Sequence, residues 1–152
     1  MAALKWPLAG SPRGLALGDL DADGQVDAVV AGAAPGSLTT LTRGFSSAQE
    51  QEFGELLNDV VLHDLDGDGD LDAAVVDLAT SSLHLLLGGP EGFAAPTQIL
   101  TGPAPEQLAV VAMDPGGALA VVTGGRAIDG VAVHASALTP GAHTLGEGRS
   151  EE

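Results

Sequence analysis

Short runs of alternating hydrophobic and polar residues recur along the chain, separated by clusters of Gly, Pro, Ser and Asp. The runs are enriched in Val, and none sustains a helical period over ten residues, which indicates β-strands. Turns are expected at 79–81 and 88–92. In the middle of the chain the pattern predicts four strands: Asp59–His63, Leu71–Leu78, Ser82–Leu87 and Ala94–Leu100.

The same pattern is repeated along the sequence. The segment Gly14–Val30 matches Asp59–Val75, and the first aspartates of their acidic loops, Asp19 and Asp64, are 45 positions apart. A third, degenerate copy runs over Leu108–Val122. Four short antiparallel strands recurring at about this period are typical of the blades of a β-propeller.

We therefore predict an all-β protein of about three four-stranded antiparallel blades, forming one repeat domain over residues 1–152. The units are expected at 14–54, 55–102 and 103–145, and the third shows no clear fourth strand. Residues 3–8 are a candidate strand for completing a blade, and residues 146–152 are expected to be a flexible tail. Three blades are fewer than propellers usually have, so either copies of the chain assemble or the chain is a fragment of a larger propeller.

Charge narrows the kinds of partner that the chain can bind. The sequence has 21 acidic and 5 basic residues, a formal charge of −16, which argues against binding to a nucleic-acid backbone. Nine of the 21 acidic residues lie in two short windows, so the partner that the charge implies is a cation. Since the chain has no cysteine, disulfides and thiolate metal sites are excluded.

No segment has the length and apolar character of a membrane span. Residues 1–10 also lack the apolar core of a signal peptide, because Trp6-Pro7 interrupts it. If the protein is exported, its signal is expected to lie outside this sequence.

The first acidic window has the spacing of a calcium loop. Its carboxylates fall at loop positions 1, 3, 5 and 9, with glycine at position 6, where the chain turns sharply. A carbonyl at position 7 would add another oxygen, and a hard cation prefers six to eight of them. The expected ligands are Asp19, Asp21, Asp23, Gln25 (through its carbonyl) and Asp27.

The second window repeats this spacing in full, so two calcium sites are predicted. Its expected ligands are Asp64, Asp66, Asp68, Asp70 (through its carbonyl) and Asp72. In the third unit, Asp114 is the one carboxylate in the four ligand columns, and that loop is predicted to be empty.

These loops differ from an EF-hand, whose position 12 is a bidentate glutamate; here that position is Val30 or Val75, within an apolar run. The alternative interpretation is a solvated acidic turn that uses Asp and Gly for backbone geometry alone. Crowding four carboxylates without a cation raises their pKa values and destabilises the fold. Two independent copies with ligand spacing therefore favour metal binding.

The run Ser82–Thr97, together with Asp64–Val76, resembles the FG-GAP/VCBS repeats of integrin-type propellers. The resemblance extends over about 14–135, with weaker echoes at Phe53-Gly54 and Gly32–Pro35, and the third unit departs from it in its loop. It implies a calcium-binding propeller, extracellular or at the cell surface. Such propellers act in cell adhesion and ligand recognition, or as accessory modules of secreted enzymes.

Two functions follow as hypotheses. The first is a module that binds protein or carbohydrate, in which calcium rigidifies the loops between strands. The second is an accessory or catalytic fragment of a secreted enzyme acting on polysaccharide. The sequence favours the non-enzymatic module, because no nucleophile elbow, zinc-protease helix or phosphate loop is present and the clustered carboxylates are already assigned to the metal loops.

Overall fold

The computed structural model describes residues 5–113, 118–126 and 131–136. These residues form strands and no helix, which confirms the all-β prediction. The first sheet has the order β1 (Ser11–Gly18), β2 (Asp27–Ala33), β3 (Ser37–Thr42), β4 (Ser47–Glu52). The second has the order β5 (Leu57–His63), β6 (Asp72–Asp77), β7 (Ser82–Leu86), β8 (Thr97–Leu100). The third consists of β9 (Gln107–Ala112), β10 (Leu119–Gly124) and β11 (Val131–Ser136), with β10 in the middle.

Within each sheet, every pair of hydrogen-bonded strands is antiparallel. The strands expected in the second unit are found close to their predicted bounds, but β8 begins at Thr97 instead of Ala94. Pro96 has no N–H to donate to a neighbouring strand, and the N–H of Ala94 donates to Leu87 O. Residues 5–8, within the candidate strand at 3–8, lie outside the strands, where Pro7 likewise lacks a donor. The predicted tail at 146–152 lies outside the described residues.

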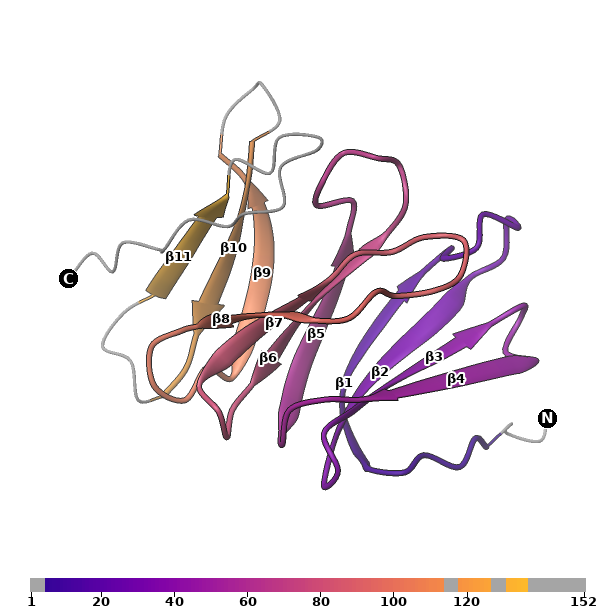
Figure 1. Cartoon of the computed structure of the whole chain (residues 1–152), viewed down its shortest axis with the longest axis horizontal. Coiled ribbons are helices and arrows are strands. Elements are labelled where there is room, and N and C mark those ends of the chain that lie inside the picture. The colour runs from indigo at the N-terminus through magenta and orange to yellow at the C-terminus, as the bar shows by residue number, and fades with distance from the viewer. Residues whose placement is uncertain (1–4, 114–117, 127–130, 137–152) are drawn as a thin grey trace.

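The first strands of the three sheets lie side by side (Figure 1). Arg13 Nη1 donates to Asn58 Oδ1 at 3.2 Å, and Asn58 Nδ2 donates to Glu106 O at 2.6 Å, so one side chain joins all three sheets. Leu108 N also donates to the carboxylate of Asp59 at 3.1 Å. In the described part of the chain the sheets follow one another without closing into a ring.

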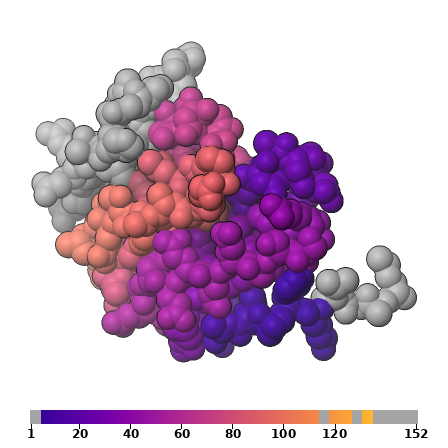
Figure 2. Space-filling view, turned by 45° about the vertical axis from the view of Figure 1, so that its right-hand side comes forward, coloured from indigo at the N-terminus to yellow at the C-terminus, as the bar shows by residue number. Residues whose placement is uncertain are grey.

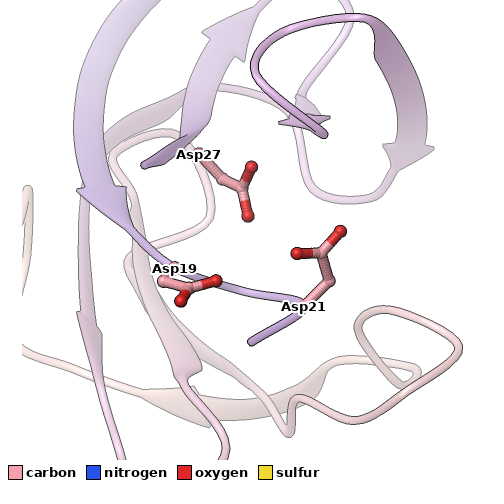
Figure 3. A group of neighbouring side chains, drawn as sticks. All are labelled: Asp19, Asp21 and Asp27. Atoms are coloured by element: carbon pink, nitrogen blue, oxygen red, sulfur yellow. The ribbon is translucent and has the colours of Figure 1, made fainter. Parts of the chain in front are cut away.

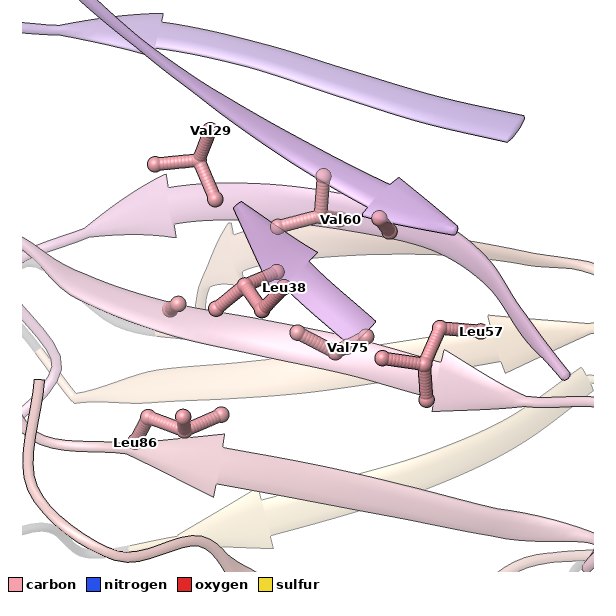
Figure 4. Packing of buried hydrophobic residues seen from close by; sticks show 8 residues of the cluster. Val29, Leu38, Leu57, Val60, Val75 and Leu86 are labelled. Atoms are coloured by element: carbon pink, nitrogen blue, oxygen red, sulfur yellow. The ribbon is translucent and has the colours of Figure 1, made fainter. Parts of the chain in front are cut away.

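Close packing between the first two sheets depends on small residues on β1. A Cβ on Gly14 would come within 2.8 Å of the Asp59 Cα, so only glycine lets β1 approach β5 this closely. Val29 and Leu38 of the first sheet face Val60 and Val75 of the second (Figure 4). The surfaces of these two sheets are continuous in the space-filling view (Figure 2).

A second core fills the space between the second and third sheets. It contains Val76 and Leu83 from the second sheet and Leu108 and Val121 from the third. Alternate residues of β6 therefore point into different cores. Ala73 and Val75 belong to the first core, and Ala74 and Val76 belong to the second. The middle sheet is buried on both faces, which explains why β6 is apolar without alternation.

A buried carboxylate holds the connection between the first two sheets. Asp77, at the end of β6, is fully buried and accepts hydrogen bonds from the N–H groups of Glu55 at 2.8 Å and Leu56 at 3.2 Å. It also accepts from Ala79 N at 3.0 Å and Thr80 N at 3.2 Å in its own turn. Although burial alone would raise the pKa of Asp77, these hydrogen bonds lower it below its usual value.

Each sheet carries a buried polar residue on its third or last described strand. Thr39 pairs with Val30 and His84 with Val75 at equivalent positions of β3 and β7, whereas His134 on β11 pairs with Val121 at a different position of its hairpin; all three polar side chains are buried. Burial lowers the pKa of His84, against the opposing attraction of Asp77, and burial alone lowers the pKa of His134. The folded chain therefore favours the neutral form of both histidines.

Acidification is expected to destabilise the protein through these histidines. Because the pKa of His134 is lower in the folded chain than in the unfolded chain, the unfolded chain binds protons first. The free energy of unfolding should then fall as the pH drops below about 6.5, the unfolded value for histidine. We expect His134→Gln to make this slope shallower, as measured by urea unfolding at several pH values. The same substitution at exposed His63 should leave the slope unchanged, and an unchanged slope in His134→Gln would contradict the assignment.

Candidate metal centres

The first acidic loop connects β1 to β2, so the strand ends fix the positions of its outer aspartates. Asp19 follows β1 directly and Asp27 is the first residue of β2. Between them, Asp19 accepts hydrogen bonds from Asp23 N at 3.1 Å and Gly24 N at 2.9 Å. Gly24 has φ +82°, a conformation that favours glycine, so the loop turns where the sequence predicts.

Three carboxylates of this loop converge. Asp19, Asp21 and Asp27 each place an oxygen within 4.8 Å of the others, and their side chains point toward a common space (Figure 3). Asp27 is fully buried, and its Oδ2 accepts a hydrogen bond from Leu20 N at 2.9 Å. Its Oδ1 is buried with no hydrogen-bond partner among the described residues. A buried carboxylate oxygen without a donor is costly, and a cation would satisfy it.

The second loop, between β5 and β6, reproduces the arrangement with Asp64, Asp66 and Asp72, whose oxygens also lie within 4.8 Å of one another. Asp64 accepts from Gly67 N at 2.7 Å and Gly69 N at 3.0 Å.

Asp72 is held from two sides. Its Oδ2 accepts from Leu65 N at 2.6 Å and its Oδ1 from Gly88 N at 2.8 Å. The spacing of the aspartates does not predict the contribution of Gly88; the turn expected at 88–92 is the signal in the sequence that indicates it.

The negative charge of the second triad is incompletely balanced within the chain. Burial raises the pKa of Asp72 most, and the nearby carboxylates of Asp66 and Asp68 raise it further. The amides of Gly88 and Leu65 oppose this shift without cancelling it. A bound cation would favour the ionised form of all three triad carboxylates.

The remaining predicted ligands lie outside the triads. Asp23 accepts from the backbone N–H of Gln25 at 2.8 Å and from its Nε2 at 2.9 Å. In the second loop, Asp68 accepts from Asp70 N at 2.9 Å. The position-5 carboxylates thus stabilise their own turns, and positions 1, 3 and 9 form both clusters. The loop of the third unit, which includes Asp114, lies outside the described residues.

A cleft of about 260 Å³ lies beside the first triad, between the first sheet and the loop after β7. Its lining includes Asp21, Thr40, Gln49 and Phe93. One triad carboxylate therefore borders a space that a ligand can enter.

No protein-family model matches the chain, and a search of curated proteins finds no match. The resemblance to FG-GAP/VCBS repeats thus stays a prediction based on the residues that carry it. Within the described residues, there is no helix with the length and hydropathy needed to cross a membrane.

Proposed function

We propose that the protein is a calcium-binding module of FG-GAP/VCBS type, built from β-propeller blades, in which the ions stabilise the loops and the scaffold binds a protein or carbohydrate ligand. The observation that carries this proposal is the repetition of one carboxylate triad in equivalent loops of two sheets. An isolated acidic cluster is common on protein surfaces, but two with the same loop positions indicate a shared ligand.

Calcium is the cation that this donor chemistry favours. The triads offer carboxylate oxygen alone, and the chain has no cysteine, so soft-metal chemistry has no support here. Waters and loop carbonyls would have to complete the six to eight oxygens that calcium takes. The family resemblance implies an extracellular location, and extracellular modules usually bind calcium with weak affinity. We expect weak binding here as well.

The blade interpretation is supported by the order of the strands and by the packing of the sheets. Two sheets follow the meander order of a propeller blade, and the first strands of all three are neighbours. In such a scaffold, loops at the edges of the blades are available for ligands. We expect the ligand at the cleft beside Asp21, where Thr40, Gln49 and Phe93 provide a hydroxyl, an amide and an aromatic ring.

Isothermal titration with calcium tests the metal sites directly. We expect two ions per chain, with weaker binding of magnesium, because magnesium demands a stricter octahedral geometry. Asp27→Asn should reduce the stoichiometry to one, since it removes the charge of the buried ligand in the first loop. As a control, Glu50→Gln removes one exposed charge outside both loops and should leave two sites. Absence of binding at millimolar calcium would falsify the proposal.

A further inference from the structure

We propose that two copies of this chain associate head to tail, the open face of the first sheet in one copy packing on the open face of the third sheet in the other. The leading face is the side of the first sheet that carries Leu15 and Leu17, which are 63% and 60% exposed. The trailing face is the side of the third sheet that carries Val111, Met113 and Val133, with exposures of 40%, 54% and 37%. This inference rests on the blade arrangement proposed above and does not depend on calcium binding.

The leading face has the same construction as a face that is already covered. Leu15 pairs with Val30 in the first sheet as Val60 pairs with Val75 in the second. Leu17 similarly occupies the position of Leu62. In the second sheet, Val60 and Leu62 occupy these positions. Val60 belongs to the core between the first and second sheets, and Leu62 packs against that core. The leading face is therefore equivalent to the face of the second sheet that the first sheet covers.

The trailing face shows the converse relation. Ala109 pairs with Val122 in the third sheet as Val61 pairs with Ala74 in the second, and Val111 lies two residues from Ala109 on the same face of β9. Val61 and Ala74 pack on the third sheet within the second core.

Val133 occupies the register position of Leu85: it pairs with Val122 as Leu85 pairs with Ala74. Leu85 and Ala74 belong to the same core against the third sheet. The trailing face of the third sheet is thus equivalent to the face of the second sheet that packs on the third sheet.

The two open faces consequently relate to each other as the covered faces do inside the chain. A second copy is the partner that presents the complementary face at the right register. The apolar residues are conspicuous in a chain of formal charge −16, and exposed apolar patches mark interaction sites. Contact between two different faces is heterologous, and it forms a ring when the rotation closes.

Two copies are the number that we expect in such a ring. The described residues of each chain form three sheets, so two copies would contribute six, within the four to eight blades usual for propellers. Three copies would exceed that range.

Sedimentation in about 0.15 M salt, which screens the acidic charge, measures the association. We expect a species of twice the 15.0 kDa chain mass. Leu17→Glu, on the leading face, and Val111→Glu, on the trailing face, should each give a monomer because each blocks both contacts of a two-copy ring. Leu100→Glu is the matched control: Leu100 is 77% exposed but belongs to β8 of the middle sheet, so its substitution should leave the dimer intact.

Mixing the two variants distinguishes head-to-tail association from other modes. Each variant keeps the face that the other has lost, so an equimolar mixture should regain one interface and form an open heterodimer. Circular dichroism of each variant checks that the sheets are retained. A monomeric wild-type chain, a species larger than two copies, a dimer that survives Val111→Glu, or a mixture that stays monomeric would each overturn the proposal.

Discussion

Calcium at about 10 mM is expected to raise the free energy of unfolding by about 4.6 kcal/mol relative to the calcium-free protein. With a dissociation constant of ~0.2 mM, each of two sites contributes about 2.3 kcal/mol at this concentration by mass action. The effect arises because the ion binds carboxylates that are gathered in the folded chain and dispersed in the unfolded one. Urea unfolding in calcium and in chelator measures the difference.

Asp66→Asn separates this effect from any structural role of the loop. The substitution keeps the side-chain shape but removes one charged ligand of the second triad, so about half of the calcium increment should be lost. In chelator the variant should be as stable as the wild type or slightly more stable, because Asp66 repels the ionised form of Asp72. Glu91→Gln, an exposed change outside both loops, should keep the full increment. An increment that survives Asp66→Asn undiminished would speak against the second site.

The second large effect is expected at Asp77, whose replacement by asparagine should lower the free energy of unfolding by about 3 kcal/mol. Asparagine would replace one of the two carboxylate oxygens by an NH2 group, which would face either the N–H of Glu55, now bound to Oδ2, or that of Ala79, now bound to Oδ1. Glu52→Gln, at the exposed end of β4, removes the same charge without this loss. The measurement is urea unfolding in chelator.

The gain in the free energy of unfolding on adding calcium distinguishes Asp77 from a metal ligand. Asp77 lies outside both triads, so Asp77→Asn should reduce stability while the gain on adding calcium stays the same. If Asp77→Asn unfolds as the wild type does, the buried network does not hold the first two sheets together in the way described.

Sequence pattern alone predicted the strands of the middle sheet, and it located the aspartates that lie nearest to the strand ends. Asp19 and Asp27 flank the ends of β1 and β2, so the alternation that predicts the strands also locates these side chains. Position 5 could not be predicted in this way. Asp23 and Asp68 accept hydrogen bonds from amides two residues ahead, and Asp66 does so while staying in its triad, so the spacing does not reveal which aspartate lies outside the cluster.

Contacts between sheets were also beyond the sequence pattern. Asp77 reaches Glu55 across 22 positions, and nothing in the alternation of β6 marks its last residue as the acceptor for a connection between sheets. Gly54 supplies a partial signal: its φ of +68° and its closeness to the Asp77 carboxylate require glycine. That requirement becomes visible only when the two sheets are packed.

The hydrogen bonds of Asn58 fix the positions of β1 and β9 along the axis of β5. Its amide accepts from Arg13 and donates to Glu106, so neither neighbouring sheet can slide along its strand axis without breaking one of these bonds. Gly14 and Gly18 lie beside Asp59 and Leu62, so β1 and β5 run in the same direction. The connections that follow these two strands, with their aspartate triads, therefore emerge at one rim of the molecule, and a single surface approaching that rim would meet both triads together.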